Sequence, residues 1–598
     1  MPTKSKRKTP VRYTSRDFSS IKADLIDYTK RYYPDTFKDY NEASFGALML
    51  DTVAYVGDML SFYLDYQVNE SFLDTAIEYN NVIRLSRQTG YKFNGSPSSQ
   101  GILSFYALVP AVAGGPDSRY YPVLLQGSEF ASESGASFLL TENVHFGKSG
   151  AEAVVARVNS DTGAPTYFAV KAYGRISSGE TQRDTFSIGP FKRFRKVVLS
   201  SSDVVEVLSV TDSEGKEYFE VDYLTQDVVY KDFVNRGANK NTVSSIMKPV
   251  PVPRRFTVER TDEVVYLQFG HGSDERITSE AVVDPSEITL KFHGKDYVSN
   301  TAFDPTNLIE TDKLGVGPSN TTLIVKYRTN SVANTNAAVN TITTIADARL
   351  EFDDPTSLDA AQRAYVRRTL EVANEEPIVG DVETPSAEEI KIRAASMFAS
   401  QKRAVTRQDY ISLVYNMPPQ FGGVKRCNVI QDKDPLKRNL NLYVVSEDEE
   451  EILVETNNTI KNNIKTWISR HKMVNDTVDI LDARVINLKI NFSILGEIDQ
   501  NRFDLLTEAV AAIKEKFSTM PDLGEPFYLT DVHEALRTVP GILDVLDVKV
   551  SVASGDVYSD TVFNVKEHLS PDNRYITMPE SFIWEIRYPD IDIRGTIR

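Results

Sequence analysis

The sequence is poor in the side chains that build disulfides and metal sites. It holds one cysteine, Cys427, among 598 residues. One thiol can form neither an internal disulfide nor a cysteine-based zinc site, so stability must come from packing. Histidine is also scarce and scattered, which excludes a local His-x-x-x-His metal pair. The six histidines are His145, His271, His293, His471, His533 and His568.

Long apolar runs and repeats are missing as well. No stretch approaches about 18 uninterrupted apolar residues, so we expect no transmembrane helix. The basic start, residues 1–12, is followed by no apolar segment, and we expect a solvated arm rather than a secretory signal. A partner-binding role for this arm is the alternative. No repeat of fixed period suggests a solenoid.

The overall composition is that of a folded protein. Hydrophobic residues make up 41% and charged residues 25% of the chain, and the length suggests about four domains at roughly 150 residues each. The formal net charge is −17. A surface this acidic is poorly suited to binding nucleic acid, because the affinity of proteins for nucleic acid depends mainly on basic side chains that neutralise the phosphates.

Residues 13–95 form the first predicted region, and their pattern is helical. Thr14 and Asp17 have capping-box spacing before a helix over about 16–32. A second helix, with Asn41 as its N-cap, runs without proline to about Val68. A third starts at Ser71, with Asp74 at its capping-box position, and stops near Gly90; the three helices predict a small bundle. The second helix is apolar around most of its circumference, which predicts burial on several sides. We therefore assign a partner interface to ten of its residues, the alternative being that these rings fill the core of the bundle itself. The ten are Phe45, Leu48, Met49, Val53, Tyr55, Val56, Met59, Phe62, Tyr63 and Tyr66.

The remaining chain changes character twice. Residues 96–345 show short runs rich in β-branched and aromatic residues between turn signals, which predicts a β-rich region of two domains. Residues 346–480 and 481–598 predict two mixed α/β domains. Ser386 with Glu389, and Thr406 with Asp409, are capping boxes that begin helices. The fold class is therefore multidomain α+β, with an N-terminal helical bundle, β-rich middle domains and mixed α/β C-terminal domains.

Three details of the C-terminal half are also predicted. The acidic run 447–451 is assigned to a turn and a helix N-terminus, where negative charge is favourable, in preference to a metal site. A helix places Phe503, Leu506, Val510, Ile513 and Phe517 on one apolar face. A last helix is capped by Thr530.

Local signatures of chemistry are weak. Gly147-Lys148-Ser149 resembles the end of a phosphate-binding loop, but Glu142 stands where its first glycine belongs. Gly315 and its neighbours fit a tight turn better than a dinucleotide fingerprint, and Cys427 fits a buried strand position. We expect no catalytic residue, cofactor or metal. Paired carboxylates for glycan hydrolysis remain open, because their spacing leaves no mark in the sequence.

Several stretches together resemble one family. This family is the baseplate wedge protein of large contractile-tailed phages, within the baseplate J-like family. The resemblance rests on Tyr13–Phe18, Asn41–Gly46, Leu50–Asp58, Asn69–Ala76, Arg84–Tyr91, Arg403–Tyr410, Gly524-Glu-Pro and Val539-Pro-Gly-Ile542. These matches span most of the chain; residues 110–300 match by position only.

The resemblance implies a non-enzymatic structural subunit of a virion tail, assembled in the host cytoplasm. It implies pairing with a second copy and with other wedge subunits, and contacts with neighbouring wedges, hub and sheath. The C-terminal domain would then serve oligomerisation, and the ring of wedges would transmit the rearrangement that triggers sheath contraction. No nucleic-acid partner and no membrane insertion are expected. The alternatives are a tail-associated glycan hydrolase and a receptor-binding fibre component, although fibres usually contain repeats.

Overall fold

The structure is a computed structural model of the 598-residue chain. It describes residues 17–35, 41, 44–112, 115–147, 152–234, 245–272, 314–330, 332, 334–432, 439–497, 501–555 and 557–598. The predicted basic arm and Thr14 lie outside these residues. The chain divides into two compact units, Met1–Phe93 with Pro385–Lys402, and Asn94–Thr384 with Arg403–Arg598. The predicted fold class is confirmed: helices come first, sheets follow, and the C-terminal part mixes both.

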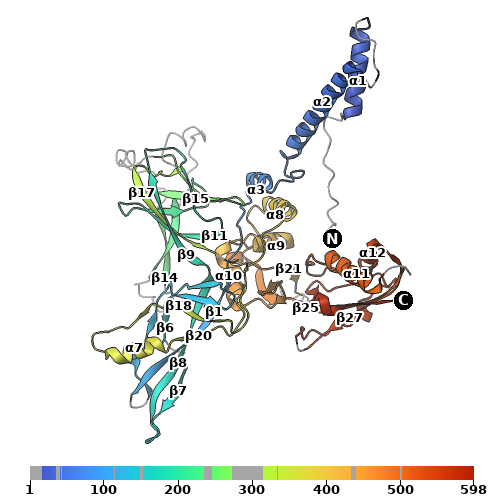
Figure 1. Ribbon diagram of the computed structural model, residues 1–598. Helices are drawn as coiled ribbons and strands as arrows, with labels where there is room; N and C mark the ends of the chain where they lie inside the picture. The colour runs from blue at the N-terminus through green and yellow to red at the C-terminus, as the bar shows by residue number, and fades with distance from the viewer. Residues whose placement is uncertain are drawn as a thin grey trace. The chain divides into compact units, whose positions relative to one another are not determined.

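The first unit is helical, and we refer to it as the helical unit. Its helices α1 and α2 lie side by side (Figure 1). Its third helix, α3, packs against α8, which lies some 300 residues later in the chain, and Ile83 and Ile390 are buried between them. The bundle therefore depends on a distant segment that the N-terminal sequence does not contain. The helices are α1 Phe18–Tyr32, α2 Phe45–Asn69, α3 Tyr79–Gln88 and α8 Ala387–Ser400.

Two predicted helix starts in this unit are wrong. The cap of α2 is Ser44, whose Oγ accepts from the Ala47 amide at 3.1 Å, and not Asn41. The third helix begins at Tyr79 instead of Ser71. The buried Glu70 carboxylate explains the delay, because it accepts from the amide of Ile77 at 2.8 Å and holds the preceding loop in a non-helical path.

An eight-stranded sheet is the first part of the second unit. Long strands β1 and β8 pair antiparallel at its centre, from Gln100↔Ser177 to Pro110↔Tyr167, and a core including Phe105, Phe130 and Phe138 lies against it. We call residues 101–178 and 334–384 the eight-stranded body, into which the chain enters at Gln100, the first residue of β1. Its elements are β1 Gln100–Val112, β2 Gly115–Pro116, η1 Ser118–Tyr120, β3 Val123–Leu124, β4 Glu129–Ser132, β5 Ser137–Leu140, β6 Val144–His145, β7 Glu152–Val158, β8 Pro165–Ser178, β18 Ile342–Asp347, β19 Leu350–Glu351, α7 Ala360–Arg368 and β20 Glu371–Ala373.

A seven-stranded sheet is inserted between β8 and β18. Its strand order is β10-β16-β15-β12-β11-β17-β9, and Leu267, Phe269 and Tyr327 are among its fully buried side chains. We call the described residues of 180–329 the seven-stranded body. Its strands are β9 Glu180–Ile188, β10 Lys196–Val198, β11 Val204–Thr211, β12 Glu217–Glu220, β13 Val228–Val234, β14 Ser245–Pro251, β15 Arg255–Arg260, β16 Val265–Phe269 and β17 Thr321–Thr329, of which β13 and β14 form a separate hairpin.

Residues 403–482 form the four-stranded body, in which helices cover a small sheet. The capping boxes predicted at Ser386 and Thr406 are both present, and they begin α8 and α9. The assignment of the acidic run 447–451 is only partly right: residues 449–451 form a turn, but Glu447 is the buried last residue of β22, and α10 begins later, at Asn458 with Asn457 as its cap. Cys427 is buried in β21, as predicted. The elements are α9 Arg407–Tyr415, η3 Pro419–Phe421, β21 Arg426–Gln431, β22 Asn439–Glu447, β23 Leu453–Val454, α10 Asn458–Ser469 and β24 Thr477–Asp482.

Residues 484–598 form the C-terminal body, where α11 and α12 pack on a four-stranded sheet around β25 (Figure 1). The predicted face of α11 is confirmed for Ile513, which is buried, and for Leu506, Val510 and Phe517, which pack partly buried against the same core. Phe503 is the exception, because it is 80% exposed; Leu505 and Ala509 are buried and were not predicted. The last long helix starts at Leu529 with Tyr528 as its N-cap, so the Thr530 cap is wrong. The elements are β25 Arg484–Gly496, α11 Arg502–Lys516, β26 Phe527–Tyr528, α12 Leu529–Thr538, β27 Ile542–Ala553, α13 Val565–His568, β28 Tyr575–Ile576, β29 Phe582–Glu585, α14 Pro589–Asp592 and β30 Ile593–Ile597. The domain boundaries of the sequence analysis stay predictions.

Two buried carboxyl groups predict how the stability of this second unit depends on pH. Burial raises the pKa of Glu585 to about 7 and that of Asp381 to about 6. Each folded-state pKa lies above the unfolded value, so both groups favour folding at low pH, and this stability is lost as pH rises through about 6 to 7. We expect the free energy of unfolding to fall by on the order of a few kcal/mol between pH 5 and pH 8. Denaturant titrations at both pH values check this, and Glu585→Gln should flatten the difference; an unchanged difference in that variant would contradict the assignment.

Candidate partner interface

Helix α2 is long because nothing in its sequence stops it. Ser44 caps its start, and 25 residues without proline follow to Asn69. Proline is the residue that most strongly breaks a helix interior. The helix is therefore a continuous rod, on which each residue turns by about 100° relative to the one before it.

Helix α1 covers one side of this rod, where the residues are small or acidic. Ala54 is fully buried there. Gly57 has no side chain, and a Cβ at that position would lie 3.2 Å from Cδ1 of Ile21. Lys22 Nζ reaches Asp51 Oδ1 at 2.8 Å. Small residues thus allow α1 to approach closely, and an ion pair fixes its position.

The opposite side of α2 is covered by nothing among the described residues. It spans an arc of about 200°, as placed by the helical turn, and large apolar side chains occupy almost all of it. Their exposed fractions lie between 39% and 76%. We call these residues the α2 surface: Phe45, Leu48, Met49, Val53, Tyr55, Val56, Met59, Leu60, Phe62, Tyr63, Leu64 and Tyr66.

All ten residues of the predicted partner interface belong to the α2 surface. The structure adds Leu60 and Leu64, which were missing from the prediction although the same helical spacing could have identified them. The alternative, that these rings fill the bundle's own core, does not fit their exposure. That they contact a partner stays a prediction, because exposure alone does not identify what covers a surface.

The aromatic rings of the α2 surface are already partly ordered against one another. The Phe62 and Tyr66 rings stack with centroids 6.5 Å apart, and the Phe62 and Tyr63 rings meet edge-on at 5.9 Å. Tyrosine combines a large apolar area with a polar hydroxyl, and it is enriched at protein–protein interfaces for that reason. The surface therefore has the chemistry of a protein contact.

By length and composition alone, α2 could also cross a membrane, although the sequence contains no uninterrupted apolar run. This is weak evidence. Three carboxylates, Asp51, Asp58 and Asp65, recur along the helix at seven-residue spacing. Each acidic group placed at a bilayer centre costs about 2.5–3.5 kcal/mol on insertion scales, which favours a protein partner over lipid.

The packing of α1 on α2 yields a direct prediction. Gly57→Leu should push α1 away, because the new side chain would enter the space of Ile21, at a cost of about 1–3 kcal/mol for an overpacked contact. Hydrogen exchange should accelerate in α1 and stay unchanged in the C-terminal body. The matched control is Leu60→Ala on the uncovered side, and protection of α1 equal to wild type in Gly57→Leu would refute the contact.

One cavity, with a volume of about 1070 Å³, is lined by Glu455, Asp482 and Asp560 among others. The Asp482 carboxylate accepts from Lys461 Nζ at 2.6 Å and from the Thr456 amide at 3.1 Å, so it serves as a structural anchor. Among the described residues, no group of three or more His, Cys, Asp or Glu side chains could hold a metal ion. His293 and Lys148-Ser149 lie outside those residues.

Comparison with known proteins gives one family match. Residues 17–88 match the model of the bacteriophage baseplate protein N-terminal domain. No curated protein matches the chain. A chain in the cryo-EM structure of the anti-feeding prophage (AFP) baseplate, 6-fold symmetrised, aligns over 95% of this chain and 98% of its own length, at 10% identity and a TM-score of 0.29. A TM-score of 0.29 is too low to support a conclusion about fold or function from this alignment. The matched residues 17–88 contain α1, α2 and α3 with the whole α2 surface, and their similarity to a baseplate domain supports a structural role in a baseplate.

Proposed function

We propose that this chain is a wedge subunit of the J-like type in the baseplate of a contractile tail, and that the α2 surface joins it to partner helices. The single observation that carries the proposal is the apolar arc of α2, which α1 leaves uncovered within a segment similar to a baseplate domain. Apolar patches of this extent on soluble proteins mark interaction sites.

The width of the α2 surface indicates how many partners it needs. A helix at the edge of a core buries an apolar stripe of about 100°. The α2 surface is about twice as wide, measured by the helical turn, so one neighbouring helix cannot cover it. At least two further helices would surround α2, one of which a second copy of this chain could supply and the others neighbouring wedge subunits.

In the assembled tail, we propose that wedges joined in this way close into a ring around the hub and pass its rearrangement to the sheath. A ring requires that a heterologous contact repeat at a rotation that closes. The C-terminal body, which has a hydrophobic core of its own, is the proposed second contact and would serve oligomerisation. The location is the virion tail, and no nucleic-acid partner is proposed.

The test is electron microscopy of the particle that carries this protein. Particles assembled without it should lack an ordered baseplate, and a map of the complete particle should show helical density against the α2 surface. A chain absent from the purified particle, or an α2 surface facing solvent in the map, would overturn the proposal. Lysis of cell-wall glycan by the purified chain in a zymogram would favour the hydrolase instead.

A further inference from the structure

Residues 94–100, Asn-Gly-Ser-Pro-Ser-Ser-Gln, connect the helical unit to strand β1, and we call them the strap. Ser98 and Ser99 are fully buried and Gln100 nearly so. Connecting segments usually run over the surface, since a buried loop must find partners for its backbone polar groups. The burial of the last three residues of this connection therefore needs an explanation.

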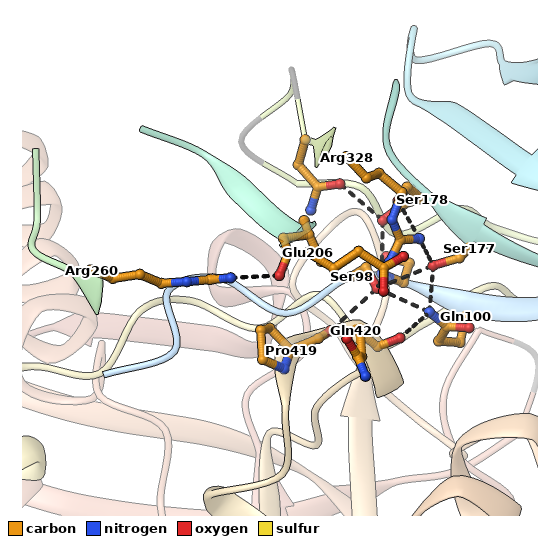
Figure 2. A network of polar contacts seen from close by, with 12 residues as sticks. Ser98, Gln100, Ser177, Ser178, Glu206, Arg260, Arg328, Pro419 and Gln420 are labelled. Atoms are coloured by element: carbon orange, nitrogen blue, oxygen red, sulfur yellow. Dashed lines mark hydrogen bonds and ion pairs between the residues drawn. The ribbon is translucent and has the colours of Figure 1, made fainter. Parts of the chain in front are cut away.

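The seven-stranded body holds the strap with two arginines (Figure 2). Arg260, from β15, donates to the carbonyl oxygen of Asn94 and, at 2.7 Å, to that of Val205. Arg328, at the end of β17, donates to Ser98 Oγ at 3.5 Å, to Ser177 Oγ, and at 3.0 Å to the Ser178 carbonyl. Glu206 balances its charge, with Oε1 3.1 Å from Arg328 Nη2.

The four-stranded body holds the other side of the strap. The Ser98 amide donates to the Pro419 carbonyl at 2.9 Å, and Gln100 Nε2 donates to the Gln420 carbonyl at 2.9 Å. Asn457 Nδ2 donates to the Gln100 carbonyl at 2.6 Å. Gly422 lies so close that an added Cβ would be 3.2 Å from the Ser98 carbonyl oxygen. The contact is therefore both polar and closely packed.

The eight-stranded body completes the enclosure. The Gln100 amide donates to the Val379 carbonyl at 2.8 Å. The Ser99 amide donates to Ser178 Oγ at 2.9 Å, and the Ser178 amide returns a bond to the Ser99 carbonyl at 2.9 Å. The strap is thus hydrogen-bonded to all three bodies, and the three strap residues that make most of these bonds, Ser98, Ser99 and Gln100, are buried.

A buried polar network of this kind resists partial opening. Separating one body would leave donors and acceptors of the others unpaired away from water, which costs far more than the net gain of each bond. Arg328 is a buried charge whose partner Glu206 is only partly buried, and leaving a buried charge without its partners is especially costly. The bonds should therefore break together.

We propose that the strap is a mechanical coupling: it separates from the eight-, seven- and four-stranded bodies only in one cooperative step, so that a displacement of the helical unit reaches all three bodies at once. This inference rests on the proposed function, because only a subunit held through its helices experiences such a displacement.

Native-state hydrogen exchange on the isolated full chain tests the coupling. The amides of Ser98, Ser99, Gln100 and Ser178 should share one slow opening reaction, with the same dependence on added denaturant. Separate openings for these amides, or exchange as fast as that of exposed turns, would overturn the proposal without any variant.

Arg328→Met should accelerate exchange of all four amides together, by at least tenfold. The matched control is Lys326→Met, which changes an exposed cation two residues earlier in the same strand and should leave the four amides unchanged. Acceleration confined to Ser178 in Arg328→Met would show a local role and overturn the coupling. The exchange experiment contains no partner, so a result against the coupling would leave the proposed function unaffected. The proposed function is tested separately, by whether the baseplate assembles without this chain.

Discussion

Val56→Asp should abolish assembly of this chain with its baseplate partners. Val56 lies in the middle of the α2 surface and is half exposed in the isolated chain, so the new carboxylate is hydrated until a partner covers it. Burying one unpaired charge in an interface costs several kcal/mol, and each 1.4 kcal/mol corresponds to a tenfold loss of affinity. The expected loss is at least hundredfold, measured by co-purification and by analytical ultracentrifugation with the neighbouring subunits.

Val56→Asp should leave the second unit of the chain intact. The melting temperature of that unit should equal the wild-type value, because none of its residues is changed. Val474→Asp is the matched control: Val474 lies in a turn of the four-stranded body and is 98% exposed, and this variant should assemble normally. Normal assembly of Val56→Asp would remove the main support for the α2 surface as an interface.

Gly270→Ala should destabilise the seven-stranded body by about 3 kcal/mol or more. A Cβ on Gly270 would lie 2.0 Å from the carbonyl oxygen of Gly315 and 2.4 Å from that of Leu314. Both obstacles are backbone atoms, so no side-chain rotation relieves the clash, and overpacking that forces backbone shifts reaches this cost. Unfolding of the full chain in denaturant, followed by exchange in β15, β16 and β17, measures it.

Gly189→Ala provides the comparison for this effect. A Cβ on Gly189 meets no atom within 4 Å, so this variant should change stability by less than about 0.5 kcal/mol, the usual range for surface changes. Equal stabilities of the two variants would show that the turn at Gly315 does not close against Gly270. Gly315 itself has φ +84°, which fits the tight turn predicted from its sequence.

Local signals predicted several parts of the fold correctly because the atoms involved are close in sequence. In the capping boxes at Ser386 and Thr406, the side-chain oxygen accepts a hydrogen bond from the backbone amide three residues later. This contact lies within one helical turn, so it depends little on the rest of the fold. The β structure of residues 96–345 likewise followed from short β-branched and aromatic runs, and β1 and β11 lie in that region. Periodicity along α2 placed all ten predicted interface residues on its uncovered side.

Predictions failed where a distant or unexpected contact outweighed a local preference. Ser71 and Asp74 have the right spacing for a helix start, yet the Glu70 carboxylate binds the loop amides first. Phe503 fits the apolar face by spacing, but it is 80% exposed, whereas Leu506, Val510 and Ile513 of the same face pack on the core of the C-terminal body. Neither outcome could be read from residues within one helical turn.

The breadth of the apolar surface on α2 was encoded in its sequence alone, because helical geometry converts residue spacing directly into an angle. Which side stays uncovered was set by the packing of α1, which selects the small residues Ala54 and Gly57 because only they allow close approach. The enclosure of the strap also depended on tertiary structure, since Arg328 and Ser98 stand 230 positions apart. Contacts of that separation leave no periodic trace in a sequence; they arise when sheets and helices formed locally are brought together by burial of their apolar faces.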